Sequence, residues 1–113
     1  MRRPAWRSRV GLALLLAGLA VTPSRAEAQG RWTTAAPMPE ARTEVAVAEV
    51  SGKIYVVGGF GGSGALLEYD PGTDRWRERA RPPRALHHAT AAEVGGRLYV
   101  IGGYTAGWTP VDT

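Results

Sequence analysis

The sequence predicts an all-β fold built from repeated units of short antiparallel strands, as in the blades of a β-propeller. Two observations carry this prediction. The phrase KIYVVGG at residues 53–59 returns as RLYVIGG at residues 97–103, 44 positions later. Each copy is a β-branched and aromatic run that ends in two glycines, which is typical of a strand covered on both faces. A fixed period of 20–50 residues is typical of solenoids and propellers.

The repeat extends beyond this phrase. When residues 31–69 are compared with residues 75–113 at the same offset, 13 of the 39 pairs are identical without a gap. Eight of these identities fall within residues 48–60 and their partners at 92–104. The residues that we expect to shape the repeated structure are Tyr55, Gly58, Gly59, Trp76, Tyr99, Gly102 and Gly103.

One period contains four expected strands, at residues 44–50, 54–57, 66–69 and 75–77. The first strand alternates, with Val45 and Val47 on one face and small alanines on the other. The pair Ser51-Gly52 after it is a two-residue hairpin signal. Residues 70–73 (DPGT) are a turn by composition. Four antiparallel strands in one period, covered on both faces, describe one propeller blade.

The N-terminus predicts a secretory signal peptide at residues 1–28. Residues 1–9 carry four arginines and no acid, residues 10–21 are uncharged and apolar, and a small-x-small cleavage site ends at Ala28. The apolar run is shorter than the ~20 residues of a membrane-spanning helix. We therefore expect export to the periplasm or the extracellular space, with no membrane attachment after cleavage. The general route is favoured over the twin-arginine route, because the residues after Arg2-Arg3 fit the latter signal poorly.

Removal of the signal changes the charge of the chain. The signal holds five of the 14 basic residues and one of the ten acidic ones, so the mature chain has 14 − 5 = 9 bases and 10 − 1 = 9 acids. The net charge is then zero, and no basic patch predicts a nucleic-acid partner. The chain has no cysteine, which excludes disulfides and thiolate zinc sites.

The repeat resembles the kelch motif. The residues that carry this resemblance are P-x-x-R at 39–42, the Gly-x-Ile/Leu-Tyr-Val-x-Gly-Gly phrase at 52–59 and 96–103, Glu68-x-Asp70-Pro71, and Trp76 six residues after Asp70. The resemblance covers about residues 31–113. Two departures are visible: Arg84 lies two positions earlier in its repeat than Arg42, and residue 113 falls inside the third strand of the second repeat.

The resemblance implies kelch-type β-propeller blades over residues 29–113, in an incomplete propeller. We expect one complete four-stranded blade at 37–80, a partial blade at 81–113, and at 31–36 a strand around Trp32 that belongs to a neighbouring blade. A blade buries its faces against its neighbours, and propellers need ~4–8 blades. We expect the chain to be the beginning of a longer propeller; the alternative is a short unit that closes a ring with copies of itself.

Two patterns that resemble a cofactor site or a metal site are better explained as structural parts of the fold. Residues 59–64 (GFGGSG) match a dinucleotide fingerprint, but the helix that this site needs does not follow, and the second copy (GYTAGW) loses the pattern. We expect no cofactor. His87 and His88 are adjacent and would point to opposite faces of a strand, so we expect no metal site. A structural or loop role is favoured for them, because the sequence places no carboxylate beside them.

Trp108 is the strongest candidate for ligand contact, since it stands in the loop after the second Gly-Gly, where the first copy has Gly64. An exposed loop tryptophan can stack on a sugar or anchor a peptide. The alternative is that it packs on the next blade. Arg42, Arg84 and His87 are further ligand-binding candidates, because their positions in the repeat would also let them project toward a binding face.

The favoured function is an exported module that binds a protein or a glycan. The alternative is an enzyme acting on sugars, because the resemblance also reaches sialic acid mutarotases and the propeller domain of galactose oxidase. The copper chemistry of galactose oxidase needs a tyrosine–cysteine pair, and the cysteine is absent here. The loops in view show no acid–base pair, so we predict no catalytic residues.

Overall fold

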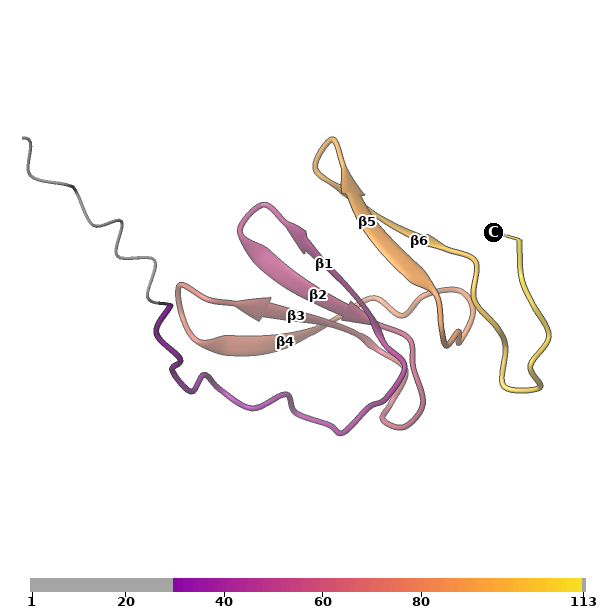
Figure 1. Cartoon of the computed structure of the whole chain (residues 1–113), viewed down its shortest axis with the longest axis horizontal. Coiled ribbons are helices and arrows are strands. Elements are labelled where there is room, and N and C mark those ends of the chain that lie inside the picture. The colour runs from indigo at the N-terminus through magenta and orange to yellow at the C-terminus, as the bar shows by residue number, and fades with distance from the viewer. Residues whose placement is uncertain (1–29, 113) are drawn as a thin grey trace, which may run out of the picture. The chain divides into compact units, whose positions relative to one another are not determined.

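The computed structural model describes residues 30–112, so the predicted signal at 1–28 and its cleavage after Ala28 lie outside the described residues. Within this range the chain contains six strands and no helix (Figure 1). The strands are β1 (Ala46–Val50), β2 (Lys53–Val57), β3 (Leu66–Asp70), β4 (Arg75–Arg79), β5 (Thr90–Val94) and β6 (Arg97–Ile101). No helix in this part of the chain is long and apolar enough to cross a membrane. The all-β prediction is confirmed.

Strands β1 to β4 form one antiparallel sheet in the order β1-β2-β3-β4, which we call blade one. The register of its first hairpin pairs Ala46 with Val57. Both turn residues, Ser51 and Gly52, have positive φ, at 52° and 79°, as the favoured two-residue hairpin turns require. The first strand begins at Ala46 rather than at the expected Glu44, because Glu44 has a φ of 56° and is not extended.

Strands β5 and β6 form a second hairpin whose pairing of Thr90 with Ile101 repeats the β1–β2 register at the offset of 44. Beyond β6, Tyr104 forms isolated bridges to His87 and to Pro110. Strand β5 runs beside β1, so equivalent first strands of the two repeats are neighbours (Figure 1).

The segment before blade one contains no strand. Trp32 is 99% exposed, and residues 30–38 have no regular secondary structure. At Ala36 the segment is tied to the β3–β4 end of the sheet. The Ala36 N–H donates to the Asp74 carboxylate at 2.7 Å, and its carbonyl accepts from Trp76 Nε1 at 2.9 Å. Pairing of residues 31–36 with another blade stays a prediction.

The alanine face of β1 is the buried one. Ala46 and Val50 are buried, whereas Val47 on the opposite face is 53% exposed. Val57, paired with Ala46, lies on the alanine face and lines the gap to the β5–β6 hairpin together with Ala89 and Val100. Small side chains on the first strand leave room for the neighbouring strand, so part of the core lies between the two repeats. Val56 and Leu67, which are also buried, lie on the opposite face of the sheet with Val47.

The glycines that end β2 allow this close approach. Gly58 and Gly59 have φ values of +71° and +89°. A Cβ on Gly58 would overlap the carbonyl oxygen of Leu86, and a Cβ on Gly59 would overlap that of Thr43. The Gly59 N–H donates to the Leu86 carbonyl at 2.8 Å, which is a backbone hydrogen bond between blade one and the segment leading into β5.

Gly102, the equivalent of Gly58, provides a matched comparison. It also has a positive φ, +64°, but the nearest atom to an added Cβ is the Val111 carbonyl oxygen at 3.8 Å. We expect Gly58→Ala to lower the free energy of unfolding by at least ~2 kcal/mol, from strain plus overlap. Gly102→Ala should cost only the left-handed strain of about 1 kcal/mol. Urea denaturation of both variants measures the difference, and equal losses would contradict a docking role for Gly58.

A buried carboxylate ties together the three outer strands of blade one. Glu68 on β3 is 2% exposed. It accepts from Arg79 Nε and Nη2 at 2.7 and 2.8 Å, from the Tyr55 hydroxyl at 2.9 Å, and from Lys53 Nζ at 3.3 Å. The hydrogen bonds from Arg79, and then those from Tyr55 and Lys53, outweigh burial and lower the pKa of Glu68 from 4.5 to about 2.

We expect Glu68→Gln to lose roughly 2–3 kcal/mol of stability at neutral pH, because it leaves Arg79 and Lys53 without their common anion. The unfolded carboxyl titrates near 4.5 and the folded one near 2, so the unfolded chain binds more protons between these values. Native stability should therefore fall as the pH drops through this window. Denaturation midpoints from pH 2 to 7 should show a flatter profile for Glu68→Gln. The control is Glu78→Gln on exposed β4, and a profile unchanged by Glu68→Gln would refute the assignment.

Candidate functional site

An aromatic–histidine cluster, made up of Phe60, His87, His88, Tyr104 and Trp108, lies where the two repeats meet. Phe60 follows the glycines after β2, and Tyr104 follows those after β6, so the two occupy equivalent positions. Each is fixed by a bridge to the residue at the equivalent place in its own repeat: Phe60 to Thr43, and Tyr104 to His87. The repeated Gly-Gly turn thus delivers one aromatic ring from each repeat.

His87 is the centre of the cluster and is only 3% exposed. Its ring stacks on Phe60, with centroids 4.1 Å apart, and on Tyr104, with centroids 5.9 Å apart. Trp108 meets it edge-on at 4.8 Å. A buried imidazole between two aromatic rings is held in one orientation. Each of its two ring nitrogens therefore faces a fixed hydrogen-bond partner.

A chain of hydrogen bonds runs through the two histidines. His87 Nε2 lies 2.9 Å from the Thr105 carbonyl oxygen, and the two Nδ1 atoms of His87 and His88 are 2.8 Å apart. His88 Nε2 lies 3.2 Å from the Glu44 carboxylate. Glu44 and His88 occupy equivalent positions in the two repeats and are also joined through the backbone, where His88 N–H donates to the Glu44 carbonyl at 3.2 Å.

The sequence-based expectation for the histidines was wrong in two respects. The rings do not point to opposite faces, because β5 begins only at Thr90 and His88 has a φ of 53°, which turns its side chain back onto His87. A carboxylate is also present, supplied by Glu44 from the preceding repeat. Within residues 30–112 no group of three or more His, Cys, Asp or Glu side chains could hold a metal ion.

Trp108 closes the cluster at the surface. Its ring lies 5.3 Å from that of His88 and 5.7 Å from that of Tyr104, and it is 59% exposed. A tight loop holds it, in which the Trp108 N–H donates to the Thr105 carbonyl at 2.8 Å. Its φ is 57°, a left-handed value that is uncommon for a bulky residue. One part of the ring packs on the cluster and the rest is open.

The two arginine candidates lie elsewhere. The Arg42 side chain is fully buried; its Nε donates to the Glu40 carboxylate at 2.7 Å, and its Nη1 contacts the Gly58 carbonyl oxygen at 3.4 Å. Hydrogen bonding from Arg42, followed by that from the Ser63 N–H, lowers the pKa of Glu40. These bonds give Arg42 a structural role in bracing the loop after β2.

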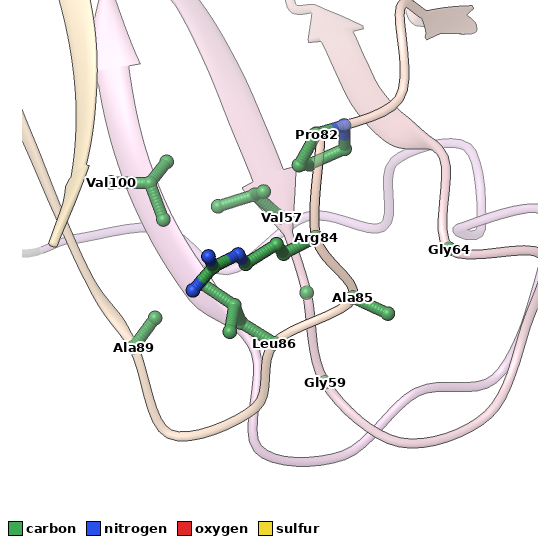
Figure 2. A pocket seen from close by; sticks show the side chains of 10 residues that line it. Val57, Gly59, Gly64, Pro82, Arg84, Ala85, Leu86, Ala89 and Val100 are labelled. Carbon is green, nitrogen blue, oxygen red and sulfur yellow. The ribbon is translucent and has the colours of Figure 1, made fainter. Parts of the chain in front are cut away.

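Arg84 lines an apolar pocket between the repeats, where its guanidinium lies among Val57, Leu86 and Val100 (Figure 2). The space in this pocket is about 30 Å³, and an adjoining, more open hollow of about 240 Å³ lies beside Pro82 and Pro83. Pockets for drug-sized ligands are ~300–1,000 Å³. Both spaces lie below this range, and the aromatic–histidine cluster is therefore the stronger candidate site.

Of the four ligand-contact candidates, the structure brings only His87 and Trp108 together. Sequence reasoning missed Glu44, Phe60, His88 and Tyr104 as members of the site. The available signal was the repeat itself, because Phe60 and Tyr104, and Glu44 and His88, are pairs separated by 44. Because an aromatic residue follows the Gly-Gly pair in both repeats, Phe60 and Tyr104 are expected at equivalent places of adjacent repeats.

Comparison with known proteins bears on the fold. The Kelch motif family models match residues 41–83 and 85–113. A search of curated proteins found no match. Among solved structures, that of a protein named YjhT is 26% identical, with a TM-score of 0.61, over 66% of this chain and 25% of the other. The chain thus spans about a quarter of that protein's length. Two consecutive motif matches and this likeness show that the chain belongs to the kelch-repeat proteins.

Proposed function

We propose that this protein is an exported kelch module that binds a ligand, a glycan in preference to a protein, on the aromatic–histidine cluster. The proposal rests on the partly exposed ring of Trp108. The buried side of this ring packs against His87, His88 and Tyr104. A fixed aromatic face offers a large contact area with little loss of conformational entropy. Such a face suits the apolar C–H surface of a sugar ring.

Polar groups at the rim of the cluster favour a glycan. The side chains of Glu44 and His88 are partly exposed, at 50% and 35%. Only one carboxylate oxygen of Glu44 is engaged by His88, so the other is free to accept from a sugar hydroxyl. Aromatic stacking combined with a few convergent polar groups is the usual composition of a small-molecule site.

Export is part of the proposal and rests on residues 1–28. Their basic start, short apolar run and small-residue cleavage site at Ala28 support secretion to the periplasm or the extracellular space. The mature chain, with equal numbers of acids and bases, would then meet its ligand outside the cytoplasm.

A second candidate function is a sugar-acting enzyme, and one observation favours it. Glu44 and His88 form a carboxylate–imidazole pair beside the aromatic surface, which is the composition of a general acid–base site. Both nitrogens of His88 and both of His87 are engaged in internal contacts, however. Binding therefore remains the preferred function.

We also propose that a further kelch blade covers the outer face of the β5–β6 hairpin. Val94, Tyr99 and Ile101 are exposed there. The equivalents of Val94 and Ile101 in blade one, Val50 and Val57, are buried, and Val57 lines the pocket that faces the hairpin. The blade could come from additional sequence or from a second copy of this chain. The mass of the purified mature chain in solution distinguishes the two: a closed oligomer supports a second copy, and a monomer contradicts it.

The binding proposal predicts that Trp108→Ala weakens oligosaccharide binding at least ~10-fold, since buried aromatic anchors dominate binding energy. The matched control is Trp32→Ala, because Trp32 is also an exposed tryptophan but lies outside the cluster. Screening the full chain against an oligosaccharide array, followed by calorimetry on the hits, measures the effect. Equal losses in the two variants would exclude a specific role for Trp108. Binding of peptides but no oligosaccharide, lost in Trp108→Ala, would identify a protein ligand instead.

A further inference from the structure

Strand β6 has an open edge. It pairs with β5 on one side, and within residues 30–112 no strand pairs with its other side. In blade one the equivalent edge is covered, because Val56 of β2 pairs with Leu67 of β3, which is fully buried. Val100, the equivalent of Val56, instead lines the apolar hollow of about 240 Å³. The second repeat therefore has the receiving half of an arrangement that blade one completes.

The C-terminal segment, residues 109–112, matches the strand that covers this edge in blade one. At the offset of 44, Val111 corresponds to Leu67 and Asp112 to Glu68. In the register of blade one, Val111 would lie opposite Val100. Cross-strand partners point to the same face of a sheet, so the Val111 side chain would project on the side of the hollow.

The residues that hold the buried acid of blade one also have equivalents on β6. Glu68 accepts from Lys53 and Tyr55, which correspond to Arg97 and Tyr99. Both equivalents are exposed, and among residues 30–112 no carboxylate forms an ion pair with Arg97. In the register of blade one, the acid of the C-terminal segment would lie opposite Tyr99. The edge thus fits a strand in which an apolar residue is followed by an acid.

In the structure the C-terminal segment pairs elsewhere. The register of blade one would place Pro110 opposite Ile101. Pro110 instead bridges to Tyr104, which is 104 − 101 = 3 residues further along the chain. The Val111 N–H accordingly donates to the Gly103 carbonyl at 3.0 Å. The hollow beside β6 is left without the side chain that the repeat would place there.

The present pairing holds Trp108 on the aromatic–histidine cluster. The Thr105 N–H donates to the Thr109 carbonyl at 3.0 Å, and the Trp108 N–H donates to the Thr105 carbonyl at 2.8 Å. In the register of blade one, Thr109 would lie three residues away from Thr105 along the partner strand, and the first of these bonds would be lost. Trp108 has a φ of 57° where the first repeat has Gly64, and a bulky residue keeps such a value only where its contacts impose it.

We propose that the open edge of β6 is a docking site for the C-terminal segment of the same chain, and that docking there removes Trp108 from the cluster. Docking buries Val111 in the hollow and places Asp112 beside Arg97, whereas the present pairing keeps the Trp108 contacts. A ligand that needs Trp108 on the cluster binds only the present pairing, so ligand binding and docking oppose each other. This last consequence rests on the function proposed above, but the docking site does not.

Engineered disulfides in the full chain test the docking, because the chain has no cysteine of its own. Val100→Cys/Val111→Cys joins positions that face each other in the docked arrangement, within the Cα separation of ~4.4–6.8 Å that a disulfide needs. The matched control is Leu98→Cys/Val111→Cys, since diagonal positions on neighbouring strands are ~7–8 Å apart. We expect the first pair to oxidise at least ~10-fold faster than the control, within one chain.

Equal oxidation rates would overturn the docking site. A disulfide between two chains would also overturn it, because a second copy would then be the occupant. If the first variant fails to fold by circular dichroism, Tyr99→Cys/Asp112→Cys is the next pair of the same register and takes its place, with Arg97→Cys/Asp112→Cys as its control.

A charge variant tests the part played by the acid. Asp112→Lys places like charges together at Arg97, and should slow oxidation of the Val100–Val111 pair by about 3-fold. Glu78→Lys makes the same change of charge on exposed β4 and should leave the rate unchanged. Equal effects of the two substitutions would contradict the pairing of Asp112 with Arg97.

The oxidised and reduced forms of the Val100–Val111 variant then compare two positions of Trp108. Its indole N–H signal in two-dimensional NMR, assigned by its loss in Trp108→Phe, should move on oxidation and return on reduction. A signal that is the same in both forms would overturn the coupling between docking and Trp108.

Oligosaccharide affinity separates this inference from the proposed function. The reduced form should bind at least ~10-fold more tightly than the oxidised form. Equal affinities would sustain the proposed function but overturn its control by docking. If the wild-type chain binds no oligosaccharide, the proposed glycan binding fails, while the oxidation rates and the indole signal still decide whether the segment docks.

Discussion

The close backbone contact between Gly58-Gly59 and Leu86 is the constraint on which the rest of the structure depends. Only residues without a Cβ can turn at these φ values while the Leu86 carbonyl approaches this closely. The hydrogen bond from Gly59 to Leu86 then anchors the segment leading into β5. This contact brings β5 beside β1 and buries the alanine face of β1 between the two repeats.

The candidate site follows from that docking, because neither repeat contains it alone. Blade one supplies Phe60 and Glu44, and the second repeat supplies His87, His88 and Trp108. The side chains meet since equivalent turns of adjacent repeats lie next to each other. Glu68 has a different part: it stabilises blade one internally by joining β2, β3 and β4, and has no contact with the cluster. The stability of blade one and the candidate site thus involve different polar groups.

Much of the fold could be predicted from the sequence. The period of 44, the Ser51-Gly52 turn and the DPGT turn placed all four strands of blade one, since each signal is local. The site was harder to predict. Left-handed φ values at Glu44 and His88 have no glycine to mark them, so the alternation rule for strands gave the wrong direction for His88. The motif around Arg42 suggested that its side chain lies on a binding face. In the structure the side chain is buried and contacts Glu40 and Gly58. The contact with Gly58 depends on the tertiary fold and could not be predicted from the local sequence.

Hydrogen exchange at the Gly59 amide tests the central claim most directly. This N–H donates across the repeats to the Leu86 carbonyl at 2.8 Å. The account predicts strong protection of the Gly59 amide, comparable with that of amides inside β2, and loss of this protection in Gly58→Ala. Exchange of Gly59 as fast as that of an unprotected turn amide in the native chain would contradict it.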